Sequence, residues 1–190
     1  MANTIELKPL NIQLLKFSIE GTTPLICHRW DEKTKKIILD GQTGKAKQPK
    51  KPKDPEDQYK QSLYIIPGGG YGFPAVAFKA AAVRAGTLAG MKMTETRQMF
   101  RVLPDDGDLV RIVGTPEMRE DMVRVQQTVD IRYRGSFPTW SATLTIQYDA
   151  DVITPEQIIN LFNRVGFAVG VGEWRMEKNG NFGCFTVKTK

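Results

Sequence analysis

The sequence holds few of the side chains that build metal centres, with two cysteines and one histidine among its 190 residues. Cys27 and Cys184 lie far apart and follow no metal-ligand spacing, so we expect neither a structural zinc site nor a disulfide framework. No apolar run approaches the roughly 18 residues of a membrane-spanning helix, and the first residues lack a signal-peptide pattern. These absences predict a cytoplasmic protein that contacts no membrane and uses no metal or other cofactor.

Two motifs of nucleotide and RNA recognition are also missing. The run from Gly68 to Gly70 is not followed by the Gly-Lys-Ser/Thr of a phosphate-binding P-loop. The aromatic motif that stacks bases in a standard RNA-recognition domain is absent as well. Three aspartates cluster over residues 105–108, but Gly107 makes this segment typical of a turn and not of a metal-dependent nuclease site.

The charged residues give a net charge of +6, which favours an anionic partner such as nucleic acid. Residues 41–60 combine lysine and proline with no aliphatic side chain larger than alanine, so they cannot bury enough apolar surface to fold alone. We expect a single domain over residues 1–190 with 41–60 as a mobile insertion. This segment is either a solvated linker or, as we favour, a basic arm that orders on phosphates. The lysines of the arm are Lys45, Lys47, Lys50, Lys51 and Lys53.

The end of the chain carries the clearest helix signal. Thr154 is a good N-cap, Pro155 suits the first turn, and Gln157 completes a capping box. Apolar residues then recur at the spacing of one helix face, and Gly166 is the expected C-cap.

A glycine-rich loop follows this helix and leads to a final strand over residues 182–187. Glycines let a backbone approach a ligand closely and expose N–H groups to an anion. A long hairpin that needs glycine for its turns is the alternative interpretation. The loop carries Gly170, Gly172, Trp174, Arg175 and Lys178.

Earlier segments alternate between strands and helices. The patterns predict strands over residues 11–21, 63–66 and 109–113, helices over 31–40, 75–86 and 91–100, and a turn over 116–120. The helix over 75–86 follows the glycine run, which would place exposed N–H groups at the positive end of the helix dipole. Lys79 and Arg84 lie on its predicted outer side, and Gly86 is its expected stop.

Apolar and polar residues alternate clearly from Met122 to Arg134 and again from Trp140 to Tyr148. With a turn over 135–138, these two segments predict a long β-hairpin with one apolar and one polar face. Arg132 and Arg134 on the polar face are either solvated strand residues or part of a stripe that contacts a nucleic-acid backbone. The alternation places Trp140 in the core and leaves Trp30 unassigned.

This order of elements predicts an α+β sandwich with helices on one sheet face, of ferredoxin-like or RNA-recognition-like topology. The C-terminal VGFAVGVGEWRMEKNGNFGCF resembles the glycine-rich loop of the RAMP superfamily, whose ferredoxin-like members form the crRNA-binding backbone of CRISPR effector complexes. The earlier IIPGGGYGFPAVAFKAAAVRAG resembles the proline-glycine segment and helix of the same family, with Gly70, Phe73 and Pro74 where the family has Ser and Lys-Gly. The whole sequence also resembles proteins of tailed bacteriophages.

The resemblance implies a non-catalytic protein that binds single-stranded RNA or DNA along the sugar-phosphate backbone, as side-by-side copies on the strand. The residues agree, because single-strand binders combine a positive groove with flat side chains for stacking. The arm lysines, Lys79, Arg132, Arg134, Arg175 and Lys178 supply charge, and Tyr71, Phe73 and Trp174 are candidate stacking groups.

Two other functions remain open at this point. Some RAMP proteins cleave RNA without a metal through a histidine near the first strand, and His28 beside Arg29 is the weak candidate here. A lone histidine is more often structural. The alternating hairpin and the arm would also serve a bacteriophage structural or inhibitory protein that binds a protein partner.

Overall fold

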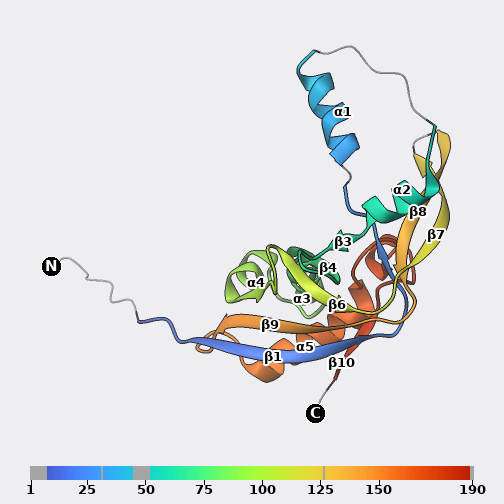
Figure 1. The fold of residues 1–190 in the computed structure, drawn as a ribbon. Helices are drawn as coiled ribbons and strands as arrows, with labels where there is room; N and C mark the ends of the chain where they lie inside the picture. Colours follow the sequence, from blue (N-terminus) through green and yellow to red (C-terminus); the bar gives the residue numbers. More distant parts are fainter. Residues whose placement is uncertain (1–7, 31, 45–51, 126, 189–190) are drawn as a thin grey trace.

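The computed structural model describes residues 8–30, 32–44, 52–125 and 127–188. Its strands are grouped into two antiparallel sheets, and its helices lie mainly against one of them (Figure 1). In chain order the elements are β1 (Ile12–Gly21), β2 (Leu25–Cys27), α1 (Glu32–Gln42), α2 (Pro55–Ser62), β3 (Tyr64–Ile65), β4 (Tyr71–Pro74), α3 (Ala75–Leu88), α4 (Met93–Met99), β5 (Phe100–Leu103), β6 (Leu109–Val113), β7 (Glu117–Val125), β8 (Thr128–Phe137), β9 (Ser141–Asp149), α5 (Pro155–Arg164), a π-helical turn (Val165–Val169), a 3-10 turn (Met176–Lys178) and β10 (Phe185–Lys188).

The larger sheet has the strand order β10-β1-β9-β6-β4-β3, and β5 continues the line of β6 along β9. β1 and β9 are the long central pair, with Lys16 opposite Thr145 and Phe17 opposite Leu144. Because side chains alternate across a strand, this register puts Phe17 and Leu144 on one face and Lys16 and Thr145 on the other.

One face of this sheet is buried under α3 and α5. Phe17 on β1 meets Phe162 on α5 edge to face, with ring centroids 5.2 Å apart, and Leu144 and Phe162 are fully buried. α5 begins as the sequence predicts, because the Thr154 side chain accepts from the Gln157 N–H and Gln157 bonds back to the Thr154 N–H. Trp140 is also in the core, as predicted. The sequence's α+β sandwich with helices on one face is therefore confirmed.

The predicted hairpin is wrong in its pairing. β8 pairs with β7 on one side and with β2 on the other, forming the smaller sheet, whereas β9 crosses to the larger sheet and pairs with β1. The predicted turn over 116–120 is the start of β7. Figure 1 shows this β7–β8 hairpin standing beside the larger sheet.

Three glycine assignments also change. α3 runs through Gly86 to Leu88, and the missing side chain of Gly86 lets Thr96 of α4 pack closely against it. The chain continues past Gly166 as the π-helical turn and ends it at Gly170, whose φ of 71° suits glycine. Gly68 to Gly70 form the turn between β3 and β4, so they do not lie at the start of α3.

The predicted mobile insertion contains a helix at its end. Asp54 caps α2 by accepting from the Asp57 N–H, and Pro55 occupies the first turn. Ser62 at the end of α2 accepts a hydrogen bond from the Gly135 N–H, so β8 holds this helix in place. Among the described residues, no helix is long and apolar enough to cross a membrane.

Candidate nucleic-acid interface

Among the described residues, the second face of the larger sheet is exposed along β1 and half-buried along β9. Along β1 the residues opposite to the core side, Leu14, Lys16, Ser18 and Glu20, are all exposed. The same face of β9 carries only hydroxyl and amide side chains between Ser141 and Gln147, and Ser18 lies 3.2 Å from Thr143 between their hydroxyl oxygens. This surface, which we call the open face, is formed by β1, β5, β6, β9 and β10 and carries polar side chains together with the exposed Leu14 and Val113.

Four strands each place a cation on the open face. Arg101 on β5 lies opposite Gln147, Lys16 on β1 opposite Thr145, and Arg111 is exposed on β6. Within the described part of the chain no carboxylate pairs with Lys16 or Arg101. Lys188 on β10 also lies here but pairs with Glu20.

None of these cations is among the binding residues predicted above, although the sequence carries one signal for them. In LKFSIE of β1, apolar Leu15, Phe17 and Ile19 alternate with Lys16, Ser18 and Glu20, which is the pattern of a strand with one wet face. The neighbours of β1 are far away in sequence, and that is why the shared face was not evident.

Most N–H groups of the glycine-rich loop already donate hydrogen bonds to carbonyl groups of the protein. The Val171 N–H donates to Gly183, the Glu173 N–H to Ile26 and the Gly183 N–H to Pro24. A Cβ at Gly183 would overlap the Val171 carbonyl, and one at Gly172 would come within 2.6 Å of the Ile26 carbonyl. The glycines, including Gly170, therefore let two stretches of the loop and β2 pack backbone against backbone. This close packing accounts for the glycines without a bound anion.

Arg175 and Lys178 lie on this loop in different settings. Arg175 donates to Glu177 at 3.0 Å and to the Gly172 carbonyl at 3.2 Å, so its guanidinium holds the loop together. Glu177 also pairs with Arg84 of α3 at 2.7 Å. Burial raises the pKa of Glu177, but the bonds and charges of Arg175 and Arg84 outweigh it and lower that pKa overall. Lys178 is exposed.

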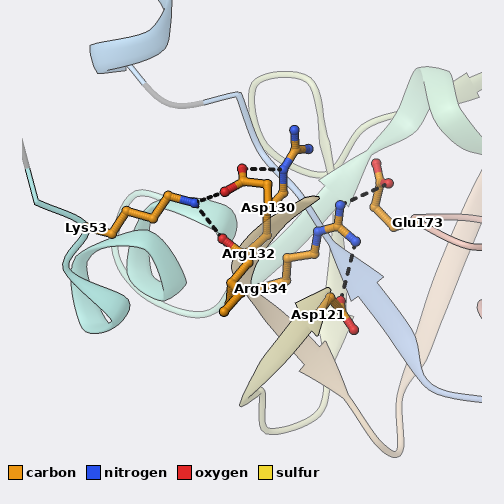
Figure 2. A network of polar contacts seen from close by, with 7 residues as sticks. Lys53, Asp121, Asp130, Arg132, Arg134 and Glu173 are labelled. Carbon is orange, nitrogen blue, oxygen red and sulfur yellow. Dashed lines mark hydrogen bonds and ion pairs between the residues drawn. The ribbon is translucent and has the colours of Figure 1, made fainter. Parts of the chain in front are cut away.

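The hairpin arginines are engaged in an internal network (Figure 2). Arg134 is 3% exposed at its side chain; it pairs with Asp121 at 3.4 Å and approaches Glu173 of the loop at 3.8 Å. Arg132 lies 3.8 Å from Asp130, which also pairs with Lys53. The bond from Lys53 is the main cause that lowers the pKa of Asp130.

Trp174 lies against arginines of the hairpin. The guanidinium of Arg119 is 5.5 Å from its ring centre and 4.7 Å from that of Phe182. These cation–π contacts join the loop to β7, so the Trp174 ring already has a partner for stacking.

The remaining predicted residues are dispersed. Phe73 is 5% exposed and packs on Phe78 in the core, so it cannot stack on a base. Tyr71 is half-buried against Phe137, and Lys79 is half-buried on α3. Lys53 lies by the hairpin, whereas Lys45, Lys47, Lys50 and Lys51 fall outside the described residues.

The sequence offers His28 as a weak catalytic candidate and a cluster of aspartates over residues 105–108. His28 is half-buried just after β2, and it has a partner of its own. Over the described ranges no group of three or more His, Cys, Asp or Glu side chains is placed to hold a metal ion. Asp105 accepts from the Arg111 N–H at 2.8 Å, as expected of a turn residue.

Comparisons with known proteins show which fold this chain resembles. No protein-family model matches the chain, and no curated protein matches it by sequence. The chain is similar to one in the cryo-EM structure of the Type III-B Cmr-beta bound to cognate target RNA, with a TM-score of 0.55 and 12% identity. The match establishes a RAMP-like fold. It covers 94% of this chain and 60% of that one.

The RAMP-like fold agrees with the resemblance drawn from the two glycine-containing segments. At 12% identity the likeness concerns the fold and not the residues of a site. The relation to bacteriophage proteins stays a prediction from the sequence.

Proposed function

We propose that this RAMP-like protein binds single-stranded RNA along its sugar-phosphate backbone and does not cleave it. The proposal rests on the open face. Lys16, Arg101 and Arg111 lie there among serine, threonine and glutamine side chains, which are the groups that contact phosphate and sugar oxygens.

The composition of the open face favours backbone contacts over base stacking. β1, β5 and β9 place no aromatic side chain on it, so a strand lying there would be held mainly by charge and hydrogen bonds. Such binding depends little on base sequence and strongly on salt, because phosphate contacts release counterions.

Two further observations support the proposal. The net charge is +6, and the chain of similar fold comes from a complex described as bound to target RNA. RNA is therefore our first choice over single-stranded DNA. We infer from the RAMP resemblance that several copies lie side by side on one strand.

The test is fluorescence anisotropy with labelled single-stranded RNA, single-stranded DNA and duplex DNA at low and moderate salt. Lys16→Glu with Arg101→Glu should weaken RNA binding at least about tenfold, and the loss of two contacts should flatten the salt slope by about 1.4. Lys60→Glu with Arg97→Glu is the matched control, because it changes the net charge equally at exposed sites on α2 and α4.

If both pairs of substitutions weaken RNA binding equally, only the net charge matters for binding. The open face would then have no specific role. No binding of any strand at low salt would remove the nucleic-acid function and leave a protein partner as the alternative. Shortening of the labelled RNA, abolished by His28→Ala, would instead establish the nuclease.

A further inference from the structure

A cleft of about 460 Å³ lies at the β3 edge of the larger sheet. Its walls come from the segment between β2 and α1, from β3, and from the turn before β6. The volume falls in the range of small-molecule sites and is sufficient for one nucleotide.

Two aromatic side chains line this cleft. Trp30 is 62% exposed, whereas Trp140 is buried and Trp174 is half-buried against arginine. Tyr64 forms the other aromatic wall and is fixed by an edge-to-face contact with Phe73, at 5.6 Å between ring centroids. An exposed tryptophan beside a fixed tyrosine offers a flat ligand a large stacking surface.

Carboxylates line the cleft from the turn before β6. The backbone of this turn is held by the bridge of Asp106 with Leu109 and by the Ala75 N–H, which donates to the Asp108 carbonyl. Among the described residues, none donates a hydrogen bond to the Asp106 or Asp108 side chain, unlike Asp105. Both carboxylates are therefore available as acceptors for N–H groups of a ligand.

Arg29 and Lys35 supply positive charge at the cleft, so positive and negative side chains both lie beside its aromatic walls. A nucleotide matches this set: its base stacks, its phosphate is attracted by the cations, and its base edge faces the carboxylates. Guanine fits best, because its N1–H and N2–H are adjacent donors. Uracil presents one N–H between two carbonyl oxygens, which a carboxylate repels.

The cleft and the open face share β6. Leu109 lines the cleft, and Arg111 lies two residues further along the same side of β6, about 7 Å away. We propose that the cleft binds one unstacked guanine nucleotide of the RNA strand that the open face holds. This inference rests on the proposed function for its strand, but the cleft can be tested on its own.

The experiment measures binding of 5′-GMP and 5′-UMP to the full chain by calorimetry. GMP should bind about tenfold more tightly than UMP. Asp106→Asn with Asp108→Asn should reduce that preference to threefold or less. Trp30→Ala should weaken GMP binding about tenfold, because it removes the stacking surface. Asp149→Asn with Asp151→Asn is the control of equal charge change at the far end of β9 and should preserve the preference.

Anisotropy with an all-uridine strand and with the same strand carrying one guanosine separates the two proposals. The guanosine should add about tenfold in affinity, and the Asp106 and Asp108 variants should lose only that gain. Equal affinities for GMP and UMP, or a preference for GMP unchanged in those variants, would overturn the proposed guanine site and leave the proposed strand binding unaffected. GMP binding without binding of either strand would overturn the proposed function and the cleft's role on a strand, leaving only a site for free nucleotide.

Discussion

Arg134 and Trp174, both assigned to nucleic-acid binding by the sequence, contact each other: the guanidinium carbon of Arg134 lies 5.7 Å from the centre of the Trp174 ring. Arg134 comes from β8 and Trp174 from the glycine-rich loop. The same charge and aromatic surface that would recognise a nucleic acid here hold two parts of the protein together. We expect their loss to change stability before it changes binding.

Arg134→Ala should lower the free energy of unfolding by about 3 kcal/mol, because it leaves the buried Asp121 with Arg119 as its remaining partner. Urea unfolding at pH 7 measures this change. Arg132→Ala removes a cation that is 33% exposed and should cost less than about 1 kcal/mol. A stable Arg134→Ala protein with lost RNA affinity would show instead that Arg134 contacts the strand.

Local signals in the sequence predicted most elements correctly. The capping box of α5 and the alternation in β1 and β9 depend on neighbours within a few residues, so they can be recognised without the fold. The ends of α3 and α5 were misplaced at Gly86 and Gly166. Close packing against Thr96 and against Phe185 explains these two glycines, and such contacts come from other elements.

The hairpin shows why the binding residues could not be predicted from alternation alone. The predicted apolar face is divided between the two sides of the β7–β8 pair. Val129 and Ile131 lie on the exposed side, opposite Arg124 and Met122, with Val129 60% exposed. Val123 lies opposite Asp130, on the side of the buried Arg134. The arginine face turns inward because Asp121, Glu173 and the ring of Trp174 compensate its charge. A pattern of period two fixes which residues share a face only within one strand, and it does not show which face meets the protein.

The open face depends on pairings that are distant in sequence. β9 brings Thr145 beside Lys16 of β1 and Gln147 beside Arg101 of β5. Each strand contributes one or two ordinary polar residues, and only the sheet order joins them into a charged surface.

Glu177→Gln should make stability depend less on pH, since Glu177 joins α3 to the loop through Arg84 and Arg175. Its folded-state pKa is lowered below the ordinary 4.5, so its contribution is present above that value and is lost as pH falls through the lowered pKa. The substitution should cost about 1 kcal/mol at pH 7 and close to nothing at pH 2, measured by urea unfolding.

A double-mutant cycle with Arg84→Ala provides the control for Glu177. The two substitutions together should cost about 0.5 kcal/mol less than the sum of their separate effects at pH 7, because both remove the same ion pair. A cost of Glu177→Gln that is equal at pH 7 and pH 2 would show that packing, and not charge, is what this side chain contributes.

Native protein should expose one thiol to a disulfide reagent at pH 8, and unfolded protein should expose two. Burial raises the pKa of Cys27 to about 12, so about one thiol in ten thousand is ionised there at pH 8, and β2 pairs it with Gly135 of β8. Cys184 is half-buried and should account for the native reaction, which Cys184→Ser should abolish. Fast reaction of Cys27 in that variant would mean that β2 separates readily from β8, because only local opening brings this thiol to the reagent.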